Sequence, residues 1–311
     1  MKYSIGVAVV LLAALLTALS GAVNEYFFYA AFVVLQFMVL ATAWNILGGY
    51  AGYVNFGTAA FFAIGSYTAV VLFTWLGAPL AVQIAAAAAV SGLLGFGVGL
   101  LTLRLRGIFF AIATVAIIFI METVMMNWRY VGGATGLQLL RPDVLQPFAS
   151  YTRMLFFVMA LLAVMAVSVA RYVQISWIGR GLRAIRDSEE AAECSGVPTL
   201  KLKLFACTVS GALMGAAGAP MPMYLSFIEP ASSFSLNYSV SALAMPMIGG
   251  TAHWIGPVIG ALLLASIQQI VTVTISNEIN VLVVGVLLVL FVVAAPDGVL
   301  GLFKRWLRSS R

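Results

Sequence analysis

Charged residues are scarce in this sequence. Of its 311 residues, 8% are Asp, Glu, Lys or Arg and 63% are hydrophobic. Soluble domains usually contain about 25% charged residues, so this chain has too little polar surface to face water on all sides. The composition excludes an ordinary soluble domain and indicates a membrane protein. Its net charge of +6 is expected to set orientation in the membrane and not to bind nucleic acid.

Cysteine and histidine are also scarce. The two cysteines, Cys194 and Cys207, are too few for a disulfide framework. His253 is the single histidine, so no Cys/His cluster is available to bind a metal. The sequence has no G-x-x-x-x-G-K-[ST] loop to hold a nucleotide phosphate, and no His/Asp/Ser constellation for catalysis. We therefore expect no enzyme activity, no metal and no cofactor bound by this chain itself.

Hydrophobic runs of about 20 residues recur from end to end, and each is long enough to cross a bilayer core of roughly 30 Å. A β-barrel would show alternating strands of about ten residues instead. The sequence therefore predicts an all-α polytopic membrane protein, with residues 1–311 forming a single transmembrane domain. The ten predicted crossings are 5–23, 26–47, 54–76, 80–102, 107–127, 154–170, 204–225, 239–251, 255–275 and 281–300.

Basic residues orient these crossings, because cytoplasmic loops are rich in Lys and Arg. Six basic residues lie within 171–203, and four more lie within 304–311. Both regions are expected to be cytoplasmic, which places the 128–153 loop outside and both termini inside. The number of crossings agrees with a cytoplasmic C-terminus only if 239–251 and 255–275 are two separate crossings, with the "GGTAHWIG" segment (249–256) turning near the cytoplasm.

Two of the predicted crossings have open alternatives. The 239–251 run is short, so it could be a broken or re-entrant helix. The first run follows Lys2 and ends in small residues, so it could be a cleaved signal peptide. We expect an uncleaved first helix, because many crossings follow it.

The segment "RAIRDSEEAAECSG" (183–196) differs from its surroundings, with six charged residues in a largely hydrophobic chain. Asp187 stands three residues before Glu190, a variant of the capping box that begins helices. Gly196 is placed to end such a helix in the left-handed conformation. The pattern predicts a helix of about two turns at 187–196, too short to persist alone in water.

This short helix has two interpretations. One side of it carries only the small residues Ala191, Ala192 and Cys194, which would let it sit deep in a groove of another protein. Alternatively, the segment is a solvated cytoplasmic loop whose arginines only set orientation. The physical pattern alone leaves both open.

A short motif and five longer segments of this sequence resemble those of a known protein family. "EAAECSG" resembles the Glu-Ala-Ala-x-x-x-Gly motif by which ABC importer permeases engage their ATPases. The segments "NILGGYAGYVNFGTAAFFAIGSYTA", "RLRGIFFAIATVAIIFIMET", "GGATGL", "RAIRDSEEAAECSGV" and "GGTAHWIGPVIGA" resemble, in order, those of the branched-chain amino acid permease family, M-type subunit. The similarity covers nearly the whole chain. It implies a fold like the larger, vitamin-B12-type importer permeases and a coupling helix near 187–196, within a cytoplasmic loop at 171–203. The implied coupling residues are Arg183, Arg186, Asp187, Glu190, Ala191, Ala192 and Gly196.

The resemblance also implies partners and a location. It predicts two ATPase subunits that use ATP, a second permease (a related H-type subunit or a second copy) and an extracytoplasmic solute-binding protein, in the bacterial cytoplasmic membrane. The family transports branched-chain amino acids, urea, amides and aromatic acids, so the solute stays open. The alternative is an ion-coupled secondary transporter. That class usually carries an intramembrane acid, for which Glu122 is the candidate here.

The segment from Asn45 to Tyr67 contains five glycines among hydrogen-bonding residues. Such a pattern predicts a broken helix, and transporters often build solute sites from broken helices. Close helix packing through small residues is the alternative, and it is the expected role of the pairs Gly211/Gly215 and Gly256/Gly260. Glu122 either serves the path or reaches the headgroups and Arg129. The candidate translocation residues are Asn45, Tyr53, Asn55, Gly57, Thr58 and Glu122.

Overall fold

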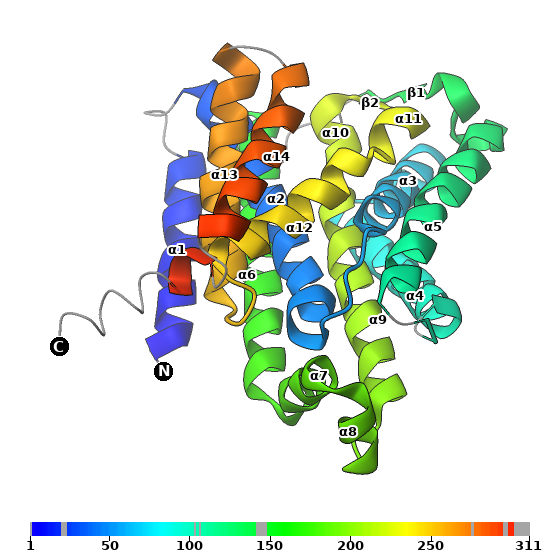
Figure 1. The fold of residues 1–311 in the computed structure, drawn as a ribbon. Helices are drawn as coiled ribbons and strands as arrows, with labels where there is room; N and C mark the ends of the chain where they lie inside the picture. Colours follow the sequence, from blue (N-terminus) through cyan, green and yellow to red (C-terminus); the bar gives the residue numbers. More distant parts are fainter. Residues whose placement is uncertain are drawn as a thin grey trace.

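The computed structural model describes residues 2–19, 24–102, 104–105, 107–140, 148–274, 277–294 and 298–301. Long helices cross one another in a single bundle, and short helices and one small strand pair lie at its ends (Figure 1). The long helices are α1 (Lys2–Leu19), α2 (Glu25–Ala51), α3 (Thr58–Leu76), α4 (Leu80–Thr102), α5 (Ile108–Asn127), α6 (Tyr151–Ile175), α9 (Thr199–Gly218), α12 (Leu236–Gly249), α13 (Ile255–Thr274) and α14 (Asn277–Ala294).

Shorter elements connect them. At one end of the bundle lie α7 (Trp177–Asp187) and α8 (Glu189–Cys194). The opposite end carries the antiparallel pair β1 (Leu137–Gln138) and β2 (Phe227–Ile228), in which Leu137 faces Ile228. The remaining short elements are η1 (Arg129–Val131), η2 (Gly133–Thr135), α10 (Met221–Leu225) and α11 (Pro230–Ser233).

Seven helical segments of the described residues are long and apolar enough to cross a membrane: α2, α3, α4, α5, α6, the α9–α10 segment 199–225, and α13. This confirms the predicted all-α polytopic membrane protein. Helices α1, α12 and α14 lie at the three other predicted crossings. Of these, α12 has 14 residues and contains Pro246, so the total of ten crossings stays a prediction.

The central helix is α2. Every residue from Met38 to Leu47 is buried, because α6, α9, α12 and α13 all pack against it. A helix that is apolar on every side is expected in such a position. Glycines allow neighbouring helices to approach closely. Gly215 lies against Ser91 of α4, and Gly260 lies against the backbone of α12 at Met245, with no room for a methyl group at either position. The predicted packing role of these glycine pairs is confirmed there.

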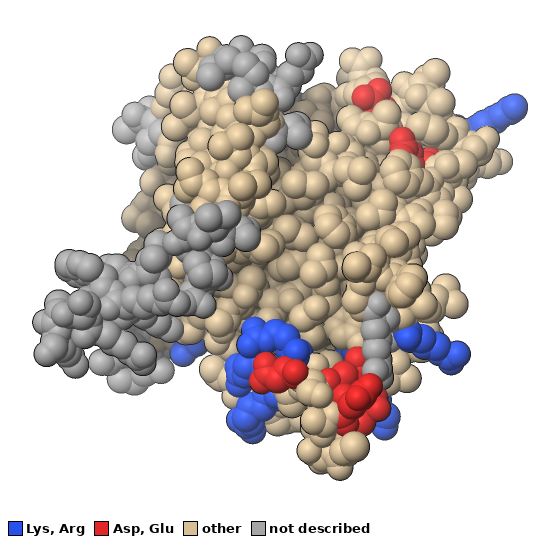
Figure 2. Space-filling view, viewed as in Figure 1, with Lys and Arg blue, Asp and Glu red and all other residues tan. Residues whose placement is uncertain are grey.

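Charged side chains lie at the two ends of the bundle and not on the surface between them. In Figure 2 they gather mainly over α7 and α8 and more sparsely at the opposite end, whereas the surface between is uncharged. The turn between α12 and α13 lies at the α7 end, because Gln174 at the end of α6 bonds to it twice. Gln174 Nε2 donates to Ala252 O at 3.1 Å, and Trp254 N donates to Gln174 Oε1 at 2.9 Å. The "GGTAHWIG" turn thus lies at the end where the charge count predicts it.

Candidate functional site

The charged segment 183–196 forms two helices and not one. Helix α7 ends at Asp187, and Ser188 is extended (φ −164°, ψ 113°) before α8 begins at Glu189. The Ser188 hydroxyl accepts a hydrogen bond from Ala191 N at 3.3 Å and so caps α8. The prediction that Asp187 begins the short helix is therefore wrong. Serine and aspartate cap helices about equally well, and the chain uses the residue after Asp187.

The end of α8 is as predicted. Gly196 has a φ of +80°. Its N–H donates to Glu193 O at 2.9 Å, and Val197 N donates to Ala192 O at 3.0 Å. These two bonds form a Schellman motif, which requires a left-handed residue at this position. The six-residue α8 is thus closed by hydrogen bonds at both ends.

Gly196→Val tests this stop. No atom lies within 4 Å of the position that a Cβ would occupy, so the cost is backbone strain alone, about 1–2 kcal/mol. We expect amide hydrogen exchange in residues 190–197 to accelerate roughly 5- to 30-fold. Gly196→Asn is the control and should change exchange less, because asparagine tolerates the left-handed conformation. Equal exchange in wild type and both variants would contradict the proposed role of the stop.

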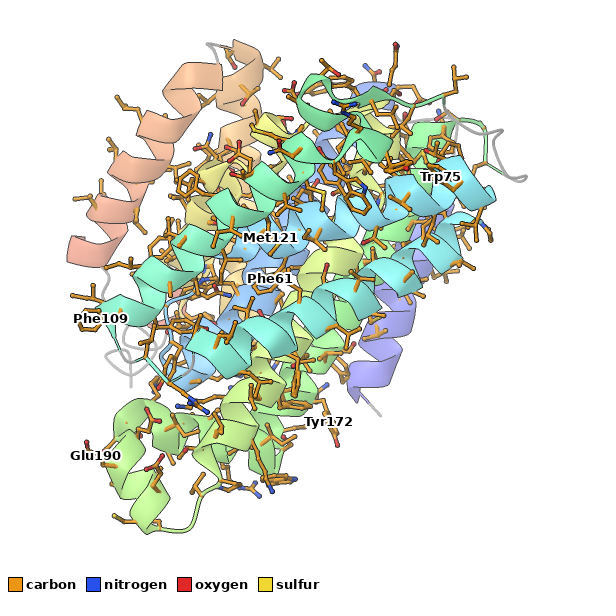
Figure 3. The ribbon with its side chains drawn as sticks, turned by 90° about the vertical axis from the view of Figure 1, so that its right-hand side faces the viewer. Phe61, Trp75, Phe109, Met121, Tyr172 and Glu190 are labelled. Carbon is orange, nitrogen blue, oxygen red and sulfur yellow. The ribbon has the colours of Figure 1, made fainter. Side chains whose placement is uncertain are left out.

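The two alanines of α8 face opposite surroundings. Ala192 is buried, at 4% exposure, in the apolar cluster that also contains Leu182 of α7 and Leu202 of α9. Ala191 is exposed. The prediction that both alanines face a partner is therefore wrong for Ala192, which packs α8 against other helices of this chain. Glu190 lies at the outer edge of this end (Figure 3). The exposed surface of α8 consists of Glu190, Ala191, Glu193, Cys194 and the cap residues that follow.

The arginines of α7 attach it to the membrane helices. Arg186 Nη1 donates to Gly49 O at 3.1 Å, and its side chain lies on Gly52, the left-handed residue that ends α2. Arg183 Nη1 donates to Gln174 O at the end of α6, at 3.3 Å. Asp187 lies 3.7 Å from Arg186 in an exposed pair, a type of contact that contributes little to stability. Arg183 and Arg186 thus fix α7 against α6 and α2.

A buried ion pair attaches α8 to the bundle. Lys203 Nζ of α9 lies 2.5 Å from Glu189 Oε1, and the two side chains are only 4% and 13% exposed. The Tyr53 hydroxyl donates to Glu189 Oε2 at 2.6 Å and accepts from Lys203 Nζ at 3.2 Å. We call these three residues the Tyr53–Glu189–Lys203 cluster. Of the three, only Tyr53 is predicted as a site residue from the sequence. Lys203 is one of several basic residues expected to set orientation, and Glu189 is one of several acids in the charged segment, so neither stands out.

The cluster lies where α2 and α3 are separated. The predicted interruption within 45–67 is confined to residues 52–57, since α2 continues through Ala51 and α3 begins at Thr58. A cavity of about 520 Å³ opens here between the break, the start of α5 and α7. Arg186 and Glu189 contribute to its wall. The structure therefore joins the break, α8 and this cavity at one end of the bundle.

The predicted translocation residues in the break and in the helices beside it are buried, and most of them have structural roles. Asn55 Oδ1 accepts from Gly57 N at 2.8 Å, which closes the turn into α3, while Asn55 O accepts from Trp44 Nε1. Asn45 Nδ2 donates to Thr251 O at 3.2 Å and so reaches the α12–α13 turn. Thr58 is fully buried at the first position of α3, with no hydrogen-bond partner for its hydroxyl among the described residues.

Glu122 is not part of this group. It is partly buried on α5. That helix contacts the break at Phe110, whose ring packs edge-on against Tyr53, and at Thr114, whose hydroxyl accepts from Phe56 N at 3.1 Å. Eight residues of helix, about 12 Å, separate Thr114 from Glu122. No ion pair between Glu122 and Arg129 is present in the described structure. Within the same residues, no group of three or more His, Cys, Asp and Glu side chains could hold a metal ion.

Comparison with known proteins identifies the family. The profile of the branched-chain amino acid transport system / permease component family matches residues 26–292. The high-affinity branched-chain amino acid transport system permease protein LivM of Salmonella typhimurium is 28% identical over 297 residues, covering 88% of this chain and 69% of LivM. The Escherichia coli LivM is 27% identical with the same coverage. The ribose import permease protein RbsC of Haemophilus influenzae is 30% identical over 41% of this chain and 40% of RbsC. No solved structure matches significantly. Because the family profile spans most of the described bundle, the chain belongs to the branched-chain amino acid transport system permease family.

Proposed function

We propose that this chain is a permease subunit of an ABC importer for branched-chain amino acids or a related small solute. The supporting observation is that α8, capped at both ends, is joined to the break between α2 and α3 by the Tyr53–Glu189–Lys203 cluster. Two ATPase subunits would bind ATP and dock on α8. A second permease would complete the path, and a solute-binding protein would deliver solute at the opposite end.

Transport would follow from the attachments of α8. When the ATPases close on ATP, they would displace α8 through its exposed residues. Glu189 would carry this displacement to Lys203 at the start of α9 and to Tyr53 in the break. Arg186, bonded to Gly49 O, would move α7 and the end of α2 together. The membrane helices would then open alternately to the two sides. The chain would form one permease domain in the bacterial inner membrane, with both termini on the cytoplasmic side. Its coupling helix would lie in a cytoplasmic loop at 171–203.

Thiol protection tests the docking surface in the intact complex. Cys194 on α8 is exposed and Cys207 on α9 is 1% exposed. We expect a maleimide to label Cys194 rapidly in the isolated permease, and at least about tenfold more slowly when the ATPases are bound. Cys207 is the internal control and should stay unlabelled in both states. Labelling of Cys194 at the same rate with and without co-purifying ATPases would contradict docking on α8.

Reconstitution separates the proposed function from its alternative. Proteoliposomes that contain only this chain should take up no solute, with or without an ion gradient. Uptake should require the ATPases, ATP and the second permease. Gradient-driven uptake by the chain alone would instead establish an ion-coupled secondary transporter.

A further inference from the structure

A second cavity lies between α2, α12 and α13, away from the break. Its volume is about 530 Å³, within the range of roughly 300–1,000 Å³ that small-molecule sites occupy. Gln36 lies 11 residues after the start of α2, and Gln268 lies six residues before the end of α13. Those helix ends, and α11 beside the cavity, are at the end of the bundle opposite α8 (Figure 1). The cavity therefore lies in the half of the bundle from which an importer receives solute.

Two buried amide side chains, those of Gln36 and Gln268, belong to the wall of this cavity. The other polar lining residues are Ser232, Ser235, Asn237, Tyr238, Ser241, Gln269 and Thr272. The Gln36 side chain is 1% exposed, and its Oε1 has no hydrogen-bond partner among the described residues. Gln268 Nε2 donates to Ser241 Oγ at 3.1 Å, which fixes both groups on the same wall. A buried oxygen without a donor is unfavourable, and a polar group inside a membrane protein is typically functional. The Gln36 oxygen is suited to accept an N–H from a molecule in the cavity.

The remainder of the wall limits what that molecule can be. Val33, Phe37 and Val240 give it an apolar part. None of the described lining residues is charged. Burying an ion without a counter-charge is strongly unfavourable, so the wall does not favour a solute with a net charge. A zwitterion, an amide or urea carries N–H groups without net charge, whereas a carboxylate anion offers no donor to Gln36.

We propose that this cavity is a solute-binding site of the permease, with Gln36 as the residue that selects solutes of no net charge that donate an N–H group. This rests on the proposed importer function and narrows it, because an aromatic or aliphatic carboxylate anion would not be accepted. Gln268 is a positioning residue that holds Ser241 beside the site. The Asn45–Thr58 segment, by contrast, couples the bundle to α8.

The chain contains a matched control for Gln36. Gln83 on α4 is 2% exposed, and its Oε1 also has no hydrogen-bond partner in the described structure. It does not line the cavity, and its Nε2 donates to Ala78 O. Gln36→Leu and Gln83→Leu therefore remove the same kind of buried amide, and only Gln36→Leu removes it from the site.

The test is uptake by the complete complex in proteoliposomes, with L-leucine, urea, acetamide and benzoate as probes. We expect the wild-type complex to take up at least one of the first three and not benzoate. Gln36→Leu should reduce that uptake at low solute concentration about tenfold or more, with ATPase recovery unchanged. Gln83→Leu should stay within about twofold of wild type.

The outcomes separate the two proposals. ATP-dependent benzoate uptake would overturn the inference and leave the importer function standing. So would equal uptake by the Gln36→Leu and Gln83→Leu complexes. Absence of ATP-dependent uptake of all four probes by the wild-type complex would contradict the proposed function itself.

The substitution Ser241→Cys places a thiol in the cavity wall and gives an independent measurement. In a Cys194→Ser, Cys207→Ala background, Ser241→Cys should react with an impermeant maleimide added from the side opposite α8, and the transported probe should slow that reaction.

Discussion

Lys203→Met is expected to release α8 from the bundle and to abolish ATPase recovery. The substitution leaves the Glu189 carboxylate buried without its counter-charge. Breaking a buried ion pair in this way costs about 3–5 kcal/mol, and the two side chains, 4% and 13% exposed, meet that condition. A six-residue helix cannot stay folded alone, so the main effect of this lost stability is that α8 leaves its position on the bundle. The measurement is pull-down of the ATPases by the tagged permease at matched expression.

Lys201→Met is the control for this substitution. Lys201 is exposed on the first turn of α9, so the control removes the same charge from the same loop. If Lys203 served only to orient the protein in the membrane, both variants would behave alike. Equal ATPase recovery by the two would contradict the anchoring role. The double variant Lys203→Met/Glu189→Met should regain thermal stability, because replacing both charges by apolar groups is often neutral. It should still transport less than wild type, because the bond from α8 to Tyr53 is lost.

Some features of this protein depend on residues that are neighbours in the sequence, and these can be predicted from it. Features that depend on residues far apart in the sequence cannot. The membrane helices follow from composition, since an apolar run of sufficient length has one favourable location. The stop at Gly196 follows from a single residue and its neighbours. The choice of Ser188 over Asp187 as the cap does not, because adjacent residues with equal capping ability leave the boundary undecided.

The site depends on contacts between distant residues, which the sequence does not determine locally. Glu189 and Lys203 are separated by 14 positions, and Tyr53 by 136 from Glu189. In the sequence Lys203 is one basic residue among many. Gln36 interrupts an apolar run on its own, and Gln268 does so together with Gln269. Only the packing of α2 against α13 brings Gln36 and Gln268 to one cavity. A buried polar residue in such a run is the one local signal that could have pointed to them.

Ala191→Trp is expected to block ATPase docking while leaving the permease itself intact. Ala191 is exposed on α8, so the indole ring meets no atom of its own chain's core. In a partner's groove that fits α8 closely, overpacking costs about 1–3 kcal/mol, which is roughly a 5- to 150-fold loss of affinity. The unfolding temperature of the purified permease should be unchanged. Both quantities are measured on the same preparation, by pull-down and by thermal unfolding.

Ala192→Trp and Ala134→Trp distinguish docking from general damage. Ala192 is buried against α7 and α9, so a tryptophan there should lower the unfolding temperature as well as ATPase recovery. Ala134 is an exposed alanine at the opposite end of the bundle, and Ala134→Trp should leave both quantities at wild-type values. If the ATPases dock on α8, the Ala191→Trp permease should recover fewer ATPases in the pull-down while its unfolding temperature stays at the wild-type value. Wild-type recovery with Ala191→Trp would show that the ATPases dock elsewhere on this end of the bundle, because no closely fitting groove could accept the ring.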